Sequence, residues 1–188
     1  MPNFVENRLT IIGTKEQIQE VKEFIKVEKT EENQEVYGIG TIDFNKITPM
    51  PKWVCRANLI GEFEREKYGD ENCWYKWSIK NWGTKWNAVS NPYRSESENV
   101  ILFTTAGDCP IDLIKKLSWI FPEVELEIAW TDEDVGYNLG IIRFKDGEIL
   151  EAIIPEGGSL EAIKLYFEIT QDSPEDYGMN ENFEYIDE

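Results

Sequence analysis

The sequence contains no histidine, and this absence removes several kinds of chemistry at once. Without histidine a chain has no Ser-His or Cys-His nucleophilic pair, no histidine general base and no histidine metal ligand. The sequence motifs of a phosphate-binding loop and of a nucleophile elbow are missing as well. We therefore expect a non-enzymatic protein that uses no cofactor and no metal ion.

Cysteine is scarce, with only Cys55, Cys73 and Cys109 among 188 residues. Their odd number and wide spacing fit neither a zinc knuckle nor a C-x-x-C redox pair. We expect reduced thiols with a structural role, as is usual inside cells.

Long apolar runs are absent too. No stretch of 18 apolar residues exists, so we expect no membrane-spanning helix. The first residues, M-P-N-F-V-E-N-R, lack the basic and then apolar pattern of a secretory signal, and we expect a cytoplasmic protein. An apolar content of 41% in a chain of this length is enough for one domain with a real core.

Positive charge is in short supply, because 37 acidic residues face 19 basic ones and the net charge is −18. The imbalance is uneven along the chain. Residues 1–122 carry a net charge of −2, whereas residues 123–188 hold 19 acids and 3 bases and carry −16. An acidic half repels nucleic acid and attracts basic protein surfaces.

Acidic residues are themselves missing from residues 72–95, which we name the Trp–Lys element. It holds four of the seven tryptophans, six aromatic residues in total and four bases. In one interpretation Trp74, Trp77 and Trp82 form the buried face of a helix that ends at Gly83. In the other, Trp82 and Trp86 flank Lys85 on an exposed turn and stack nucleic-acid bases. The candidate binding residues are then Lys76, Lys80, Trp82, Lys85, Trp86 and Arg94.

Strands and helices alternate around this element. Residues 4–12 predict a strand, and Thr14 to Gln17 fits a capping box for a helix with Ile18, Val21, Phe24 and Ile25 on one face. We expect a short extended segment at 39–44, a helical insertion at about 53–82 and a strand at 85–89.

The second half begins with an apolar strand at 99–105. A helix should follow, capped by Asp108 or Cys109, with Pro110 in its first turn and a buried stripe that includes Ile114 and Leu117. Residues 124–130 alternate as a half-buried strand, and 137–144 and 149–154 predict two more strands joined at Asp146-Gly147. Ser159 is positioned to cap a short helix.

The order strand, helix, insertion, strand, strand, helix, strand, strand predicts an α+β fold of the split βαβ type. This is an antiparallel sheet with helices on one face. We assign residues 1–154 to this domain and residues 155–188 to an acidic C-terminal extension. From Gln171 onward this extension is an acidic and aromatic tail, which is usually a disordered segment or a docked arm and less often a binding motif.

One dense acidic cluster, Asp132, Glu133 and Asp134, can be compared with a calcium loop. It lacks the glycine and the distal glutamate of such a loop, so we interpret it as a solvated turn rather than a metal site.

Four segments resemble the YubB-type ferredoxin-like family, which is of unknown function and is found on phages, plasmids and other mobile elements. The segments are M-P-N-F-V-E-N-R-L-T-I-I-G, F-N-K-I-T-P-M-P, N-W-G-T-K-W-N-A and F-T-T-A-G-D-C-P. The resemblance covers residues 1–147. Phe4 stands where the family often has tryptophan, and A-G-D-C-P replaces the more usual A-W-S-P-P. The resemblance implies a ferredoxin-like fold and a mobile-element origin, but no activity.

Two functions from different classes stay open. We favour a protein-interaction module whose acidic C-terminal face, at residues 123–188, engages a basic host protein, such as one that normally holds DNA. The simpler interpretation of the same face is that its acidity only confers solubility. The alternative is a single-stranded nucleic-acid-binding module that uses the Trp–Lys element, against which the net charge of −18 counts. The sequence does not decide the partner or the oligomeric state.

Overall fold

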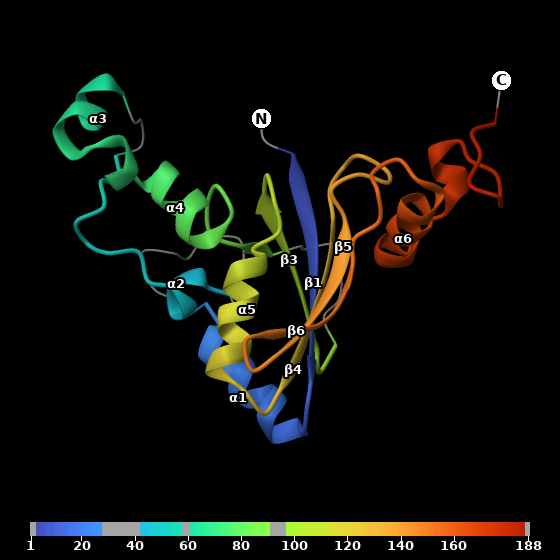
Figure 1. The fold of residues 1–188 in the computed structure, drawn as a ribbon, viewed down its shortest axis with the longest axis horizontal. Coiled ribbons are helices and arrows are strands. Elements are labelled where there is room, and N and C mark those ends of the chain that lie inside the picture. Colours follow the sequence, from blue (N-terminus) through green and yellow to red (C-terminus); the bar gives the residue numbers. More distant parts are fainter. Residues whose placement is uncertain (1–2, 28–41, 58–60, 91–96, 187–188) are drawn as a thin grey trace.

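The fold is that of a computed structural model, which describes residues 3–27, 42–57, 61–90 and 97–186. A six-stranded antiparallel sheet, in the order β2-β3-β1-β4-β5-β6, forms its centre. The strands are β1 (Phe4–Ile12), β2 (Val89–Ser90), β3 (Val100–Ala106), β4 (Glu125–Thr131), β5 (Gly140–Lys145) and β6 (Glu148–Ile153). Figure 1 shows the sheet nearly edge-on, with helices on both sides of it.

The first four strands and two helices make a ferredoxin-like unit. Helix α1 (Lys15–Ile25) follows β1, and α5 (Ile111–Ile120) connects β3 to β4. Both helices pack on one face of the sheet, and the strand order β2-β3-β1-β4 is that of a split βαβ fold. The predicted fold class is therefore confirmed, and β5 and β6 extend the sheet beyond β4.

Helix α1 begins where the sequence predicts. Thr14 accepts a hydrogen bond from the Gln17 amide, and the Gln17 side chain accepts one from the Thr14 amide. Val21 and Ile25 are buried, with Ile18 and Phe24 packed beside them. The capping box and the apolar face are both confirmed.

Helix α5 differs in its first turn. Pro110 is the N-cap residue itself, and Asp108 instead accepts a hydrogen bond from the Cys109 amide. Leu113 joins Ile114 and Leu117 in the core, because the buried face is wider than the predicted stripe.

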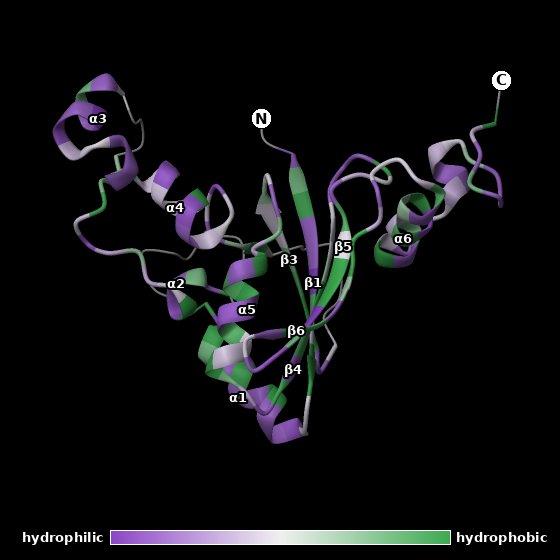
Figure 2. Ribbon diagram, viewed as in Figure 1, coloured by the Kyte–Doolittle hydropathy of each residue, from purple (hydrophilic) through white to green (hydrophobic). Residues whose placement is uncertain are grey.

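The insertion between α1 and β2 is only partly helical. It contains α2 (Phe44–Ile47), α3 (Glu62–Tyr68), a 3-10 turn η2 (Asp70–Asn72) and α4 (Trp74–Trp82). Residues 53–57 are not helical, and 58–60 lie outside the described residues. Figure 2 shows that α3 is largely hydrophilic, and Figure 1 shows it far from the sheet.

Two predicted extended segments are also corrected. Phe44 begins helix α2 because Asp43 caps it by accepting a hydrogen bond from the Asn45 amide, while residues 39–41 lie outside the described part. The strand predicted at 85–89 is reduced to β2 (Val89–Ser90). The Asn87 side chain instead bonds Asp43 and the Phe44 amide, which holds this segment as a loop against α2.

The face of the sheet opposite α1 and α5 is covered in part by α6 (Leu160–Thr170). Leu126 and Ile128 point into the large core with α1 and α5, whereas Ala129 next to Ile128 joins a second core with α6. Alternate residues of a strand point to opposite faces, so α6 lies on the other face from α5. The expectation of helices on one face of the domain at residues 1–154 holds for α1 and α5, and α6 of the C-terminal extension covers the other face.

The segment after α6 packs against that helix. It forms a 3-10 turn η3 (Pro174–Tyr177), and Met179 and Phe183 pack into the second core. Of the two predictions for this segment, the docked arm is the one observed. In the described residues, no helix is long and apolar enough to span a membrane.

Candidate binding surfaces

The Trp–Lys element is anchored in the core by its tryptophans. Trp77 and Trp82 are 6% and 4% exposed, and their ring centroids lie 5.3 Å apart in an edge-to-face contact. The indole N–H of Trp82 donates to the Thr48 carbonyl at 2.8 Å, and that of Trp74 donates to the Ala57 carbonyl at 3.0 Å. The stacking interpretation is therefore wrong for Trp82, because its ring faces the core.

The end of α4 agrees with the sequence prediction. Gly83 follows the helix in the left-handed region with φ 78°, where a residue without a side chain avoids strain. The interpretation of Trp74, Trp77 and Trp82 as one buried helix face that ends at Gly83 is confirmed for Trp77 and Trp82, while Trp74 is partly buried against the same core.

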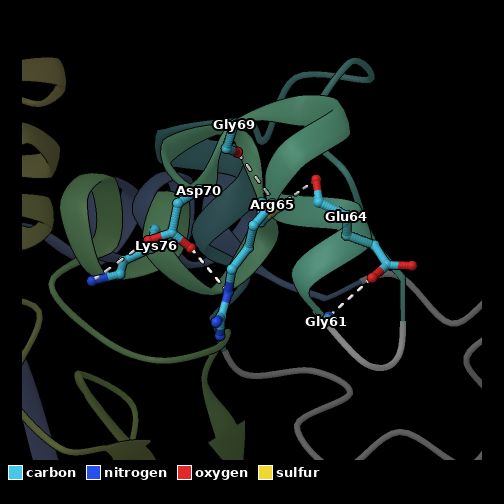
Figure 3. Close-up of polar contacts among 7 residues, drawn as sticks. Gly61, Glu64, Arg65, Gly69, Asp70 and Lys76 are labelled. Carbon is cyan, nitrogen blue, oxygen red and sulfur yellow. Dashed lines mark hydrogen bonds and ion pairs between the residues drawn. The ribbon is translucent and has the colours of Figure 1, made fainter.

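Two of the candidate lysines lie beside acidic residues of the turn before α4. Lys76 Nζ is 4.0 Å from Asp70 and Lys80 Nζ is 3.8 Å from Glu71. Asp70 also pairs with Arg65 of α3, as Figure 3 shows. These exposed pairs contribute little stability, but they offset the positive charge that a phosphate backbone would need. Another candidate, the arginine at position 94, lies outside the described residues.

Lys85 is held between two aromatic rings. Its ammonium lies 5.4 Å from the Tyr75 ring centroid and 5.2 Å from that of the half-buried Trp86. An open pocket of about 490 Å³ adjoins it, lined also by Ile79, Gly107 and Asp108. A cation, a phenol and an apolar side chain at one pocket can hold a small planar or anionic group.

A second pocket of about 420 Å³ lies elsewhere along α4. It is lined by Asn45, Met50, Arg56, Ala57, Trp74 and Trp82. Arg56 donates to the Met50 carbonyl at 2.9 Å, so its charge is partly engaged within the chain.

Cys73 and Cys109 are buried, in places that disfavour reactivity. Burial raises the pKa of the Cys109 thiol well above its ordinary value, and burial followed by the neighbouring Cys55 raises the pKa of Cys73. A neutral thiol is a poor nucleophile and a poor metal ligand. The chain brings Cys55 and Cys73 together as a parallel β-bridge, a pairing that their separation in sequence did not suggest.

The acidic cluster at 132–134 ties two elements together. Asp132 is nearly buried and accepts hydrogen bonds from the Asp134 amide and the Asn138 side chain. Glu133 accepts one from the Phe4 amide, at the start of β1. The turn is therefore a structural link between the β4–β5 loop and β1, rather than only a solvated turn. Within the described ranges, no group of three or more acids or cysteines is arranged to hold a metal ion.

A strongly acidic surface is formed by residues 155–186, which we name the acidic lobe. It carries eight carboxylates, all exposed, and one base, Lys164. The carboxylates are those of Glu156, Glu161, Glu168, Asp172, Glu175, Asp176, Glu181 and Glu184. Figure 1 shows α6 and the following segment projecting from the sheet on the side away from α1 and α5. The lobe therefore presents its negative charge to solvent on a helix and tail that pack against the sheet.

Aromatic contacts hold the acidic lobe together. Phe167 stacks on Phe183 with centroids 5.7 Å apart and contacts Tyr177 edge-on. The Tyr166 hydroxyl donates to Tyr177 at 3.1 Å, and Tyr177 donates to Asp172 at 3.0 Å. Burial, reinforced by the Tyr177 hydrogen bond, raises the pKa of Tyr166 above its ordinary value. Its proton is therefore held firmly within the packed lobe.

Sequence reasoning missed four residues that contribute to these surfaces. Tyr75 and Asp108 line the Lys85 pocket, yet they come from α4 and from the turn after β3, so no local pattern links them to Lys85. Phe183 and Tyr177 anchor the acidic lobe, and the aromatics spaced among acids at 177–185 were the signal for that docking.

Comparison with known proteins places the chain near one family. A family model described as the ferredoxin-like domain in Api92-like protein matches residues 81–180, a span that runs from the end of α4 into the acidic lobe. The crystal structure of a protein api92 from Yersinia pseudotuberculosis is similar at 9% identity with a TM-score of 0.46. The match covers 85% of this chain and 100% of that chain, and it is too weak to support any inference about the site. The comparison with curated proteins gave no match.

Proposed function

Because the chain belongs to the family of ferredoxin-like domains in Api92-like proteins, and because a fold does not define an activity, we propose a function from its surface. The protein is a non-catalytic interaction module, and its acidic lobe binds a basic protein. The proposal includes the mobile-element origin that the resemblance to the YubB-type family implies. A host protein whose basic surface normally holds DNA is the kind of partner that fits.

The observation that carries this proposal is the arrangement of charge on the lobe. Eight exposed carboxylates face solvent with one lysine among them, on a helix and tail that share a core with the sheet. Charges held on a packed scaffold keep their spacing when a partner approaches, so less conformational entropy is lost on binding. At physiological salt such charges act over about 8 Å, enough to steer a basic surface onto the lobe.

The test is a set of pull-downs from nuclease-treated lysate with three forms of the full-length protein. One variant changes Glu156, Glu161, Glu168 and Glu181 to Gln. A control variant changes Glu20, Glu62, Glu66 and Glu123 to Gln, which lowers the negative charge equally at exposed positions outside the lobe. We expect basic proteins to be retained by the wild type and the control, to be depleted with the lobe variant and to elute at moderate salt. Equal recovery with the lobe variant and the control would overturn the proposal.

A second candidate function rests on Lys85. Its ammonium between Tyr75 and Trp86, beside an open pocket, favours single-stranded nucleic-acid binding. The burial of Trp82 and the acids beside the lysines of α4 weigh against it. This candidate therefore ranks below the acidic lobe.

Fluorescence anisotropy with a labelled single-stranded oligonucleotide at low salt tests the second candidate. Lys85→Ala with Trp86→Ala should abolish binding, whereas the matched control Lys115→Ala with Trp53→Ala should keep it. Both control side chains are exposed and lie away from the Lys85 pocket. Equal affinities for the two double variants would refute a nucleic-acid site at Lys85.

A further inference from the structure

The outer strand of the sheet is unusually apolar for an edge. β6 is last in the strand order, and all six of its residues are exposed. Ile149, Leu150 and Ile153 are 52%, 52% and 47% exposed, and Ile154 directly after the strand is 58% exposed. Edge strands that stay solvated are usually protected by charges, proline or a covering element. β6 has no proline and no lysine, and its only charges are Glu148 and Glu151, the second of which is paired with Arg143. Within the described residues no further strand pairs with it.

Apolar side chains stand on both faces of this strand. Ile149 pairs with Phe144, which belongs to the core under α1 and α5, so Ile149 lies on that face. Ile153 pairs with Ile141, which packs toward the second core, so Ile153 lies on the α6 face. Residues directly opposite each other in an antiparallel pair lie on the same face of the sheet. Ile149 and Ile153 are four residues apart but lie on different faces, because the register of the β5–β6 pair shifts between Arg143 and Phe144. A strand with one solvated face would expose only one of these isoleucines, yet both are exposed. A neighbouring strand paired along β6 would cover both of them.

The apolar surface continues past the strand on the α5 side. Trp119 is 66% exposed and lies against the β5–β6 turn, where a Cβ on Gly147 would be 3.3 Å from Trp119 Cβ. Contiguous exposed apolar groups of this kind mark interaction sites. We name this set of exposed residues the β6 edge patch, and its members are Trp119, Ile149, Leu150, Ile153 and Ile154.

Charge around the β6 edge patch is close to balanced, unlike the rest of this half of the chain. Residues 140–154 hold two bases and three acids, whereas residues 123–188 as a whole hold 3 bases and 19 acids. Arg143 also bonds Glu151 of β6 at 2.5 Å and lies 3.8 Å from Glu127. A second copy, itself strongly acidic, therefore meets less repulsion here than elsewhere in residues 123–188.

We propose that β6 pairs with β6 of a second copy of this chain, forming a two-fold symmetric dimer. An antiparallel strand pair is self-complementary, as a two-fold interface requires. The pairing joins two six-stranded sheets through main-chain hydrogen bonds, and the β6 edge patches of both copies cover one another. The inference is independent of the acidic lobe, which lies beyond the end of β6.

The experiment is sedimentation velocity of the full chain over a range of concentrations, on the wild type and two double variants. Ile149→Lys with Ile153→Lys places charges on both faces of the edge. The matched control, Trp53→Lys with Phe63→Lys, changes residues that are 62% and 66% exposed in the insertion. Both variants make the chain less negative, so charge repulsion between copies falls equally. Any loss of dimer in the β6 variant alone therefore reports on the strand edge.

We expect the wild type and the control to sediment as dimers of the 21.9 kDa chain. The β6 variant should be monomeric, with dimer affinity weakened about a hundredfold, because like charges across an interface oppose association strongly. A wild type that stays monomeric at high concentration, or a dimer that the β6 lysines leave intact, would overturn the proposal. A monomer would instead leave the edge to a strand of another protein.

Hydrogen exchange on the unmodified protein gives a second readout if the β6 variant fails to fold. Amides of β6 should become more protected as protein concentration rises, while those of β2 at the other edge should not change. Protection that rises elsewhere and not in β6 would contradict the inference. Salt separates the two proposals, since it strengthens apolar pairing of two acidic chains and weakens binding of a basic protein to the acidic lobe.

Discussion

At the scale of single residues, the tryptophans of the Trp–Lys element divide by burial. Trp82 contacts Phe44 and Trp77 edge-on and uses its only donor on the Thr48 carbonyl. Trp86 is half-buried and faces Lys85. Two similar side chains four residues apart therefore have different roles, one in the core and one in a cation–π contact with Lys85.

This difference predicts unequal stability losses. Trp82→Ala should lower the free energy of unfolding by about 3–5 kcal/mol, because it leaves a large cavity and an unpaired Thr48 carbonyl. Trp86→Ala should cost about 1 kcal/mol, as expected for a half-buried position. Urea denaturation followed by circular dichroism measures both. Similar losses for the two variants would contradict the assignment of Trp82 alone to the core.

Tyr166 predicts a dependence of stability on alkaline pH. Burial holds its pKa above the ordinary 10.0, so the folded protein keeps this proton after the unfolded chain has lost it. Its contribution to stability is complete below about pH 10 and is lost as the pH rises toward the folded pKa. Thermal denaturation between about pH 9 and 11 should show a steeper loss for the wild type than for Tyr166→Phe. If the stability of the wild type and of Tyr166→Phe fell in parallel as the pH rises, the pKa of Tyr166 would be the same in the folded and the unfolded state.

At the scale of elements, α6 belongs to the sheet domain as well as to the acidic lobe. The second core joins the sheet to α6. It contains Ala129 of β4, Leu139 just before β5 and the partly buried Ile141 of β5, together with Ala162 and Phe167 of α6. Residues 155–186 therefore complete the packing of one sheet face while carrying the charge. Neutralising acids in place tests binding more cleanly than removing the segment.

Truncation after Pro155 should accordingly destabilise the whole domain. The apolar face at Ala129, Leu139 and Ile141 would be exposed, and the truncated chain should bind a hydrophobic dye and lose cooperative unfolding. The full chain with the four Glu→Gln changes of the lobe variant should do neither, because those side chains are exposed. A truncated chain that unfolds cooperatively without dye binding would show that the sheet domain is complete without α6.

At the scale of the whole molecule, the net charge of −18 opposes the folded state. Like charges crowd together on folding, and salt screens their repulsion. The melting temperature should therefore rise by several degrees between about 0.01 and 0.5 M NaCl.

The melting temperatures are measured by calorimetry on protein that also carries Ile149→Lys and Ile153→Lys. A change of oligomeric state with salt then does not contribute to the measured rise. The rise should be smaller when the four lobe glutamates, Glu156, Glu161, Glu168 and Glu181, are also changed to Gln. An equal rise in both forms would place the repulsion outside the acidic lobe.

Local sequence determined those parts of this protein that need only neighbours along the chain. The capping box at Thr14, the helix end at Gly83 and the alternation of β4 over its first four residues follow from hydrogen bonds and side-chain directions within a few residues. The order of these elements was enough for the ferredoxin-like topology. The uneven distribution of acids along the chain likewise follows from composition alone.

Tertiary structure alone decided which surfaces these elements present. The tryptophan pattern was compatible with Trp82 either in the core or on an exposed surface that stacks bases. The structure places it in the core under α1 and α5, where it packs against Phe44. Nothing local could show that α6 covers the second sheet face, that Tyr75 meets Lys85, or that β6 ends the sheet with isoleucines on both sides. Burial and exposure depend on contacts between residues distant in sequence, and those contacts exist only once the sheet has formed.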